Sequence, residues 1–67
     1  MEIEVVYLAP NAAVAGMVAE LLENEEIPVI LRPDIPHKGP TGPVEILTAK
    51  EKAKEARKIV ESYVDSF

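Results

Sequence analysis

The chain has no cysteine and no tryptophan, and its only aromatic residues are one phenylalanine and two tyrosines. Without cysteine, neither disulfides nor thiolate zinc sites are available to stabilise a small fold. A chain of 67 residues buries only about 60% of the surface that its unfolded form exposes, so its core alone gives marginal stability. We therefore expect one domain, residues 1–67, that forms a homodimer or a higher oligomer.

An excess of positive charge and a long hydrophobic run are also missing. The formal net charge is −5, which argues against a nucleic-acid partner. No apolar run reaches the roughly 20 residues that cross a bilayer, and no signal peptide is evident at the N-terminus. We expect a cytoplasmic protein with no membrane partner.

The N-terminal third predicts a strand followed by a helix. Residues 2–8 are rich in β-branched side chains, and alternation places Ile3, Val5 and Tyr7 on one face. Glu4, Val6 and Leu8 fall on the other face. Asn11 is a suitable N-cap for a helix from Ala12 to about Glu25. Its apolar stripe is expected at Val14, Met17, Val18, Leu21 and Leu22, with Ala12, Gly16 and Ala19 opposite and Asn24 as the left-handed cap.

The middle of the chain predicts two strands around a long loop. Ile27–Leu31 and Val44–Leu47 are aliphatic runs, and the segment from Pro33 to Pro43 between them holds four of the six prolines and the only histidine. Such a pattern is typical of a strand, an irregular loop and a second strand. Pro28 cannot donate to a ladder, so we expect it at the start of the earlier strand or on an edge of the sheet.

The last segment predicts a second helix. Thr48 with Glu51 three residues later resembles a capping box at a helix start. The apolar stripe of this helix is expected at Ala49, Ala53, Ala56, Val60, Val64 and Phe67, flanked by Ile59 and Tyr63.

The element order β-α-β-β-α predicts an α+β, ferredoxin-like unit that lacks its final strand. We expect a three-stranded sheet of order 1-3-2 with two helices on one face, and a crossover that joins strands one and three as a parallel pair. Strand one is then an open edge, which Glu2 and Glu4 could protect or a second copy could pair with. Self-association is also expected on the helix-free face, through Val6, Leu8, Ile30 and Leu47 or, in another register, Ile3, Val5 and Val29.

Several stretches carry a resemblance to a known family. They are Tyr7-Leu8-Ala9-Pro10-Asn11, Leu21-Leu22-Glu23, Ile27-Pro28-Val29, Gly42-Pro43-Val44-Glu45-Ile46 and the alanines Ala53 and Ala56. With them, nearly the whole chain resembles the small prokaryotic domains of unknown function named prokaryotic signal transducing proteins. One departure is Glu26, where that family commonly has glycine. The resemblance implies a fold like that of PII nitrogen-regulatory proteins and a signalling role.

The loop between the predicted strands is the main candidate binding region. Catalysis through Asp34, His37 and Thr41 would need a base, a nucleophile and oxyanion donors that nothing in the pattern brings together. Lys38-Gly39-Pro40-Thr41-Gly42 lacks the amides and the following helix of a phosphate-binding loop. We expect no enzyme activity, no metal and no cofactor. The partner- or ligand-binding residues that remain are Arg32, Asp34, Ile35, His37, Lys38, Gly39 and Thr41.

The function that the sequence favours is a non-enzymatic regulatory or protein-interaction module that recognises a partner through loop 33–43. One alternative is a sensor that binds an anionic metabolite or nucleotide between subunits. Another is an adaptor whose open sheet edge accepts a partner strand. The loop could also be only a connector between strands.

Overall fold

The sheet has three strands in the spatial order β1-β3-β2. The computed structural model describes residues 2–33 and 42–64, and in it the strands are β1 (Ile3–Ala9), β2 (Ile30–Pro33) and β3 (Val44–Ala49). β3 pairs antiparallel with both neighbours. The predicted order 1-3-2 is confirmed. The parallel pairing of strands one and three is wrong, because the two strands that run in the same direction are β1 and β2, with β3 between them.

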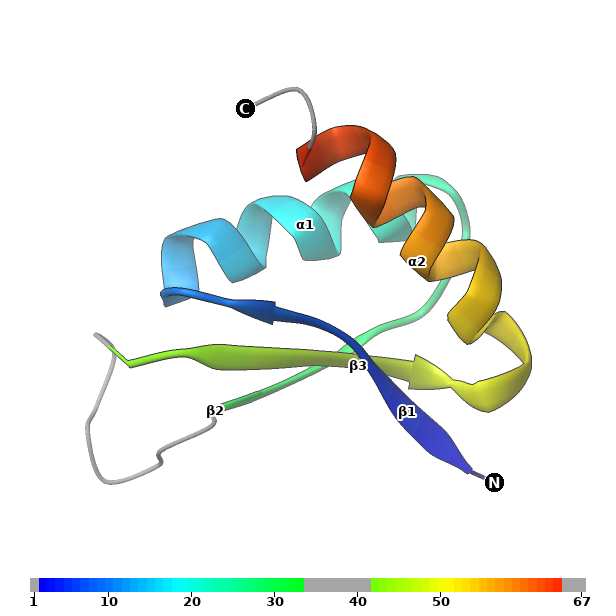
Figure 1. Cartoon of the computed structure of the whole chain (residues 1–67), viewed down its shortest axis with the longest axis horizontal. Coiled ribbons are helices and arrows are strands. Elements are labelled where there is room, and N and C mark those ends of the chain that lie inside the picture. Colours follow the sequence, from blue (N-terminus) through cyan, green and yellow to red (C-terminus); the bar gives the residue numbers. More distant parts are fainter. Residues whose placement is uncertain (1, 34–41, 65–67) are drawn as a thin grey trace.

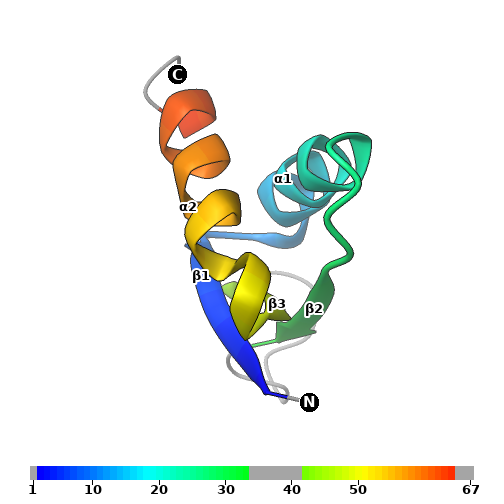
Figure 2. The same ribbon diagram turned by 90° about the vertical axis from the view of Figure 1, so that its right-hand side faces the viewer.

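Both helices lie on the same side of the sheet, as the two views in Figures 1 and 2 show. They are α1 (Ala12–Asn24) and α2 (Lys50–Val64). The predicted α+β arrangement of three strands and two helices is therefore confirmed. The opposite side of the sheet carries no helix among the described residues.

α1 begins at the predicted cap. The side-chain oxygen of Asn11 accepts a hydrogen bond of 2.9 Å from the amide of Val14, which satisfies one of the free donors of the first turn. The buried stripe differs from the prediction at three positions, because Ala15 and Ala19 are buried and Met17 is exposed. The space beside Gly16 is open, because an added Cβ would have no heavy atom of another part of the chain within 4 Å. Close packing within this chain therefore does not require a glycine there.

The turn after α1 is closed by Glu26 and not by Asn24. Glu26 has a φ of 63°, and its amide donates to the carbonyl of Glu23, while the amide of Ile27 donates to that of Leu22. These two bonds define a Schellman motif with Glu26 at the left-handed position. Ile27 and Leu22 are both fully buried, so the motif also anchors the turn in the core. β2 consequently starts at Ile30, three residues later than predicted.

A β-bulge interrupts β1. The pairing with β3 shifts between Val5 and Tyr7, so Val6 has no partner of its own. Val6 is an extra residue in β1, so the alternation of side chains between the two faces is shifted for the residues that follow it. The side chain of Val6 itself lies in the buried core. The predicted place of Val6 on the helix-free face is therefore wrong, and Leu8 lies on the same face as Ile3 and Val5.

α2 starts after β3, and the predicted capping box is absent. Thr48 belongs to β3 and is buried, and its hydroxyl donates a 2.6 Å hydrogen bond to the carbonyl of Pro28. α2 begins at Lys50, whose amide donates to the carbonyl of Glu2. The predicted stripe is confirmed at Ala53, Ala56 and Val60, which are buried. Phe67 lies outside the described residues.

The core fills the space between the helices and the sheet face beneath them. Its buried members come from all layers: Val6, Ala9, Ala15, Val18, Leu22, Ile27, Ile46, Ala53, Ala56 and Val60. Many of these are alanine or valine, which lets the helices approach the sheet closely but limits the apolar area buried.

Candidate functional site

The helix-free side of the sheet presents an ordered set of side chains in three rows. In antiparallel sheets, residues directly opposite each other share a face. The pairing of β1, β3 and β2 therefore places three rows on this side, which we call the helix-free face: Ile3 with Ala49, Val5 with Leu47 and Ile30, and Leu8 with Glu45 and Arg32.

Four aliphatic side chains of the helix-free face are exposed. The exposed fractions are 45% for Ile3, 36% for Val5, 51% for Leu8 and 50% for Ile30. Leu47, which lies between Val5 and Ile30 in its row, is only 3% exposed although it is outside the core cluster. Exposed apolar side chains gathered on one face mark a surface for interaction.

The only charged residues in these rows neutralise each other. Both Nε and Nη2 of Arg32 lie 2.7 Å from Oε1 of Glu45. Glu45 is the more covered of the two side chains. The helix-free face is thus close to neutral in a chain of net charge −5.

A hollow of about 350 Å³ lies at one end of this face, between its residues Ile3, Ile30 and Ala49 and the first turn of α2. It lies where β2 has not yet joined β3, so that Ala49 has no partner on that side. Its lining is mostly aliphatic and consists of Ile3, Pro28, Val29, Ile30, Thr48, Ala49, Glu51 and Lys52. The hollow therefore extends the apolar surface beyond the first row.

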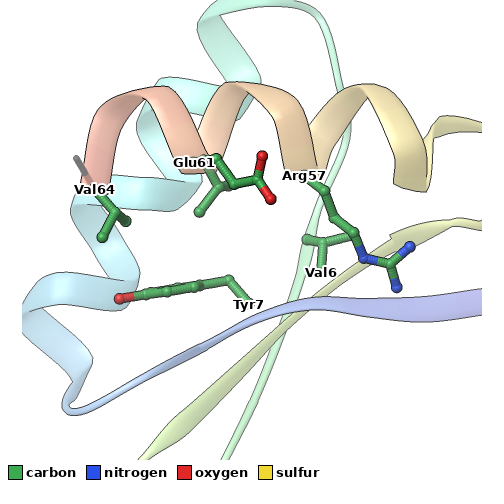
Figure 3. A pocket seen from close by; sticks show the side chains of 6 residues that line it. Val6, Tyr7, Arg57, Glu61 and Val64 are labelled. Atoms are coloured by element: carbon green, nitrogen blue, oxygen red, sulfur yellow. The ribbon is translucent and has the colours of Figure 1, made fainter.

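A second, smaller cavity of about 230 Å³ lies between β1 and α2. Figure 3 shows Glu61 and Val64 of α2 above the ring of Tyr7, while Arg57 extends along β1 away from that ring. Arg57 donates to the carbonyl of Val5 at 3.0 Å and lies 2.6 Å from the Glu4 carboxylate. This cavity adjoins the edge of β1, which has β3 as its single neighbour in the described sheet.

The predicted self-association residues come together with one exception. Ile3, Val5, Leu8, Ile30 and Leu47 all belong to the helix-free face, whereas Val6 lies in the core. Val29, the remaining alternative, packs against the core and also lines the hollow. The bulge in β1 explains this outcome. Ile3 and Val5 lie before the bulge and Leu8 lies after it, so residues from both of the predicted alternatives are on the same face.

The predicted loop site is mostly outside the part of the chain that the structure describes. Asp34, Ile35, His37, Lys38, Gly39 and Thr41 all fall in residues 34–41. Arg32 is described, and its guanidinium is paired with Glu45. The charge of this predicted binding residue is therefore balanced within the sheet.

Sequence reasoning missed Glu45, Ala49 and the walls of the hollow. Glu45 stands between aliphatic residues in a short strand, and only the register of β2 shows that Arg32 lies opposite. The hollow depends on where β2 leaves β3, which no local pattern predicts.

Within residues 2–33 and 42–64, no three side chains of His, Cys, Asp or Glu gather as a possible metal site. No helix there is both long and apolar enough to cross a membrane.

Comparison of the chain with protein-family models, with curated proteins and with solved structures finds no match. The resemblance to the prokaryotic signal transducing proteins therefore stays a prediction from the residues quoted above.

Proposed function

We propose that this protein is a non-enzymatic regulatory module that self-associates through the helix-free face. The observation that carries the proposal is the set of four exposed aliphatic side chains around a neutralised ion pair. Covering the aliphatic side chains is favourable, and covering the Arg32–Glu45 pair costs less than covering an unpaired charge, because each charge keeps its partner. The signalling role rests on the family resemblance alone.

The size of the face predicts a reversible assembly. Three strands about 4.8 Å apart and about six residues long cover roughly 300 Å² in projection. Standard protein interfaces bury about 800 Å² on each partner, and small ones are usually transient. We therefore expect a dimer that forms in the micromolar range and dissociates on dilution.

The edge of β1 is a less suitable surface than the face. The bulge at Val6, the bond from Arg57 to the Val5 carbonyl and the charge of Glu4 are devices that protect a sheet edge from further pairing. An adaptor that accepts a partner strand would have to use the remaining end of β1, beside the cavity under α2. This alternative stays a prediction.

A sensor for an anionic metabolite finds limited support in the described cavities. Ligand sites usually enclose about 300–1,000 Å³, and the larger hollow reaches only the lower end of that range. Its one cationic lining residue is Lys52, beside Glu51. A thermal-shift screen with nucleotides and oxo-acids tests this alternative, and stabilisation at saturating ligand would support it.

Two neighbouring residues of β2 provide a matched test of the proposed function. Ile30 lies on the helix-free face, whereas Leu31 pairs with the core residue Ile46 on the opposite side. Their exposed fractions are similar, 50% and 45%. We expect Ile30→Lys to be monomeric in light scattering after size exclusion, because its charge would have to be buried in the interface. Leu31→Lys should associate like the unchanged protein, and equal behaviour of the two variants would exclude this face.

A further inference from the structure

We propose that the partner on the helix-free face is a second copy of this chain, packed with its strands antiparallel to those of the first. In this arrangement Leu8 of each copy lies over Ile3 of the other, at the end of the face that adjoins the hollow. The inference rests on the proposed self-association and adds the partner's orientation.

The two ends of the face differ in shape. At one end, the row of Ile3 and Ala49 continues into the hollow of about 350 Å³. At the other end, Leu8 is the most exposed aliphatic side chain of the face. In a two-fold interface, each patch that contacts a second patch is contacted by it in turn. When the ends are exchanged, the exposed Leu8 of each copy lies over Ile3 of the other, a residue that lines the hollow, and this contact is reciprocal as the condition requires.

The charges select the same orientation. β3 is the central strand, so a two-fold axis parallel to the strands would place it over its own copy and bring the two Glu45 side chains face to face. Although each Glu45 is paired with Arg32 of its own copy, two carboxylates brought close together away from water still repel each other. An axis across the strands places Glu45 over the other copy's Ala49 instead and keeps the two Arg32–Glu45 pairs at opposite ends of the interface.

The absence of cysteine allows a direct test by cross-linking. Facing sheets lie about 10 Å apart, which is too far for a disulfide, whose Cα atoms lie roughly 4.4–6.8 Å apart, so a short bismaleimide is the suitable reagent. Leu8→Cys and Ile3→Cys change exposed side chains and leave the core intact. With a tag on one variant, the mixed product is distinguished from either self-product by size.

The two orientations predict different products. Along β1, Leu8 and Ile3 are separated by about 17 Å. In the antiparallel dimer the mixture of Leu8→Cys and Ile3→Cys should cross-link several-fold more than Leu8→Cys alone, because two Leu8 residues then lie far apart. Met17→Cys, exposed on α1 away from the face, serves as the background control.

Each other result overturns the proposal in a recognisable way. More product from Leu8→Cys alone than from the mixture would show a dimer with parallel strands, which removes this inference and leaves the proposed self-association. Background cross-linking in all samples together with a dimer in light scattering would place the interface elsewhere. Background cross-linking together with a monomer mass at all concentrations would contradict the proposed function as well. In that case, slow alkylation of the introduced cysteines would show that the helix-free face is covered within one protomer.

Discussion

Glu26 carries the least favourable backbone conformation among the described non-glycine residues. Its φ of 63° costs roughly 1–2 kcal/mol for a residue with a Cβ, and it is set by the Schellman bonds that close α1. The strain sits in a turn whose neighbours Leu22 and Ile27 are fully buried. The core therefore holds the turn in place against its local preference.

Replacing Glu26 by glycine should stabilise the protein. Glycine adopts positive φ without a steric penalty but loses more freedom on folding, so we expect Glu26→Gly to raise the free energy of unfolding by about 1 kcal/mol. Urea denaturation measures the change. Glu25→Gly is the matched control, because Glu25 has a φ of −93° and should lose stability. A loss in both variants would contradict the role given to Glu26.

Thr48 makes a long-range hydrogen bond in place of the capping box with Glu51 that the sequence predicts. Its hydroxyl bonds to the carbonyl of Pro28, twenty positions away, and so ties the segment before β2 to β3. We expect Thr48→Val, which keeps the shape and loses the donor, to reduce the free energy of unfolding by about 1 kcal/mol. Thr48→Ser should retain the bond and lose only the methyl contact. A valine variant as stable as the unchanged protein would contradict this.

At the scale of elements, Arg57 joins α2 to β1. It contacts the Glu4 carboxylate and the Val5 carbonyl, so one side chain fixes the helix over the edge strand at the bulge. Lys50 and Glu2 form a second link, but their atoms are 3.1 Å apart and both side chains are largely exposed. Exposed pairs of this kind contribute little.

The two links should therefore differ in their effect on stability. We expect Arg57→Met to lower the free energy of unfolding by about 1 kcal/mol, since a backbone hydrogen bond and an ion pair are lost together. Lys50→Met should cost less than about 0.5 kcal/mol. Thermal unfolding of both variants measures the difference, and equal losses would show that Arg57 has no special role in docking α2.

The elements themselves were largely predictable, whereas their ends and faces were not. Hydrophobic periodicity and the Asn11 cap located α1 and α2 because these signals are local. The bulge at Val6 was not predictable, because aliphatic side chains stand at Val5, Val6 and Leu8 and any register looks possible. The start of β2 was missed because Ile27, a turn residue packed in the core, continues the apolar run of the strand.

The candidate site was predictable in its members but not in its arrangement. Five of the seven residues predicted for self-association lie on the helix-free face, and only the pairing of all three strands shows that they form rows. The Arg32–Glu45 pair and the hollow arise from contacts between β2 and β3. Such contacts depend on the register between strands, because a shift of one residue would move every side chain of a strand to the other face of the sheet.

At the scale of the whole molecule, the core cluster lies on one side of the sheet, between the sheet and the two helices. The other side keeps four aliphatic side chains in solvent, which a small domain with an alanine- and valine-rich core can use to gain stability by association. The net charge of −5 opposes this association, because two copies repel each other.

Salt should therefore strengthen self-association. Added sodium chloride screens the repulsion between the acidic surfaces and leaves the apolar contact between the helix-free faces in place. The dimer dissociation constant should fall from low to high salt. An assembly held by exposed ion pairs would show the opposite dependence.

The central claim is that the helix-free face associates with a second copy, and sedimentation equilibrium of the unchanged protein tests it most directly. The account predicts an average mass that rises from the monomer to the dimer across the micromolar range, with Ile30→Lys remaining monomeric. A monomer mass for the unchanged protein at every concentration up to the millimolar range would contradict it.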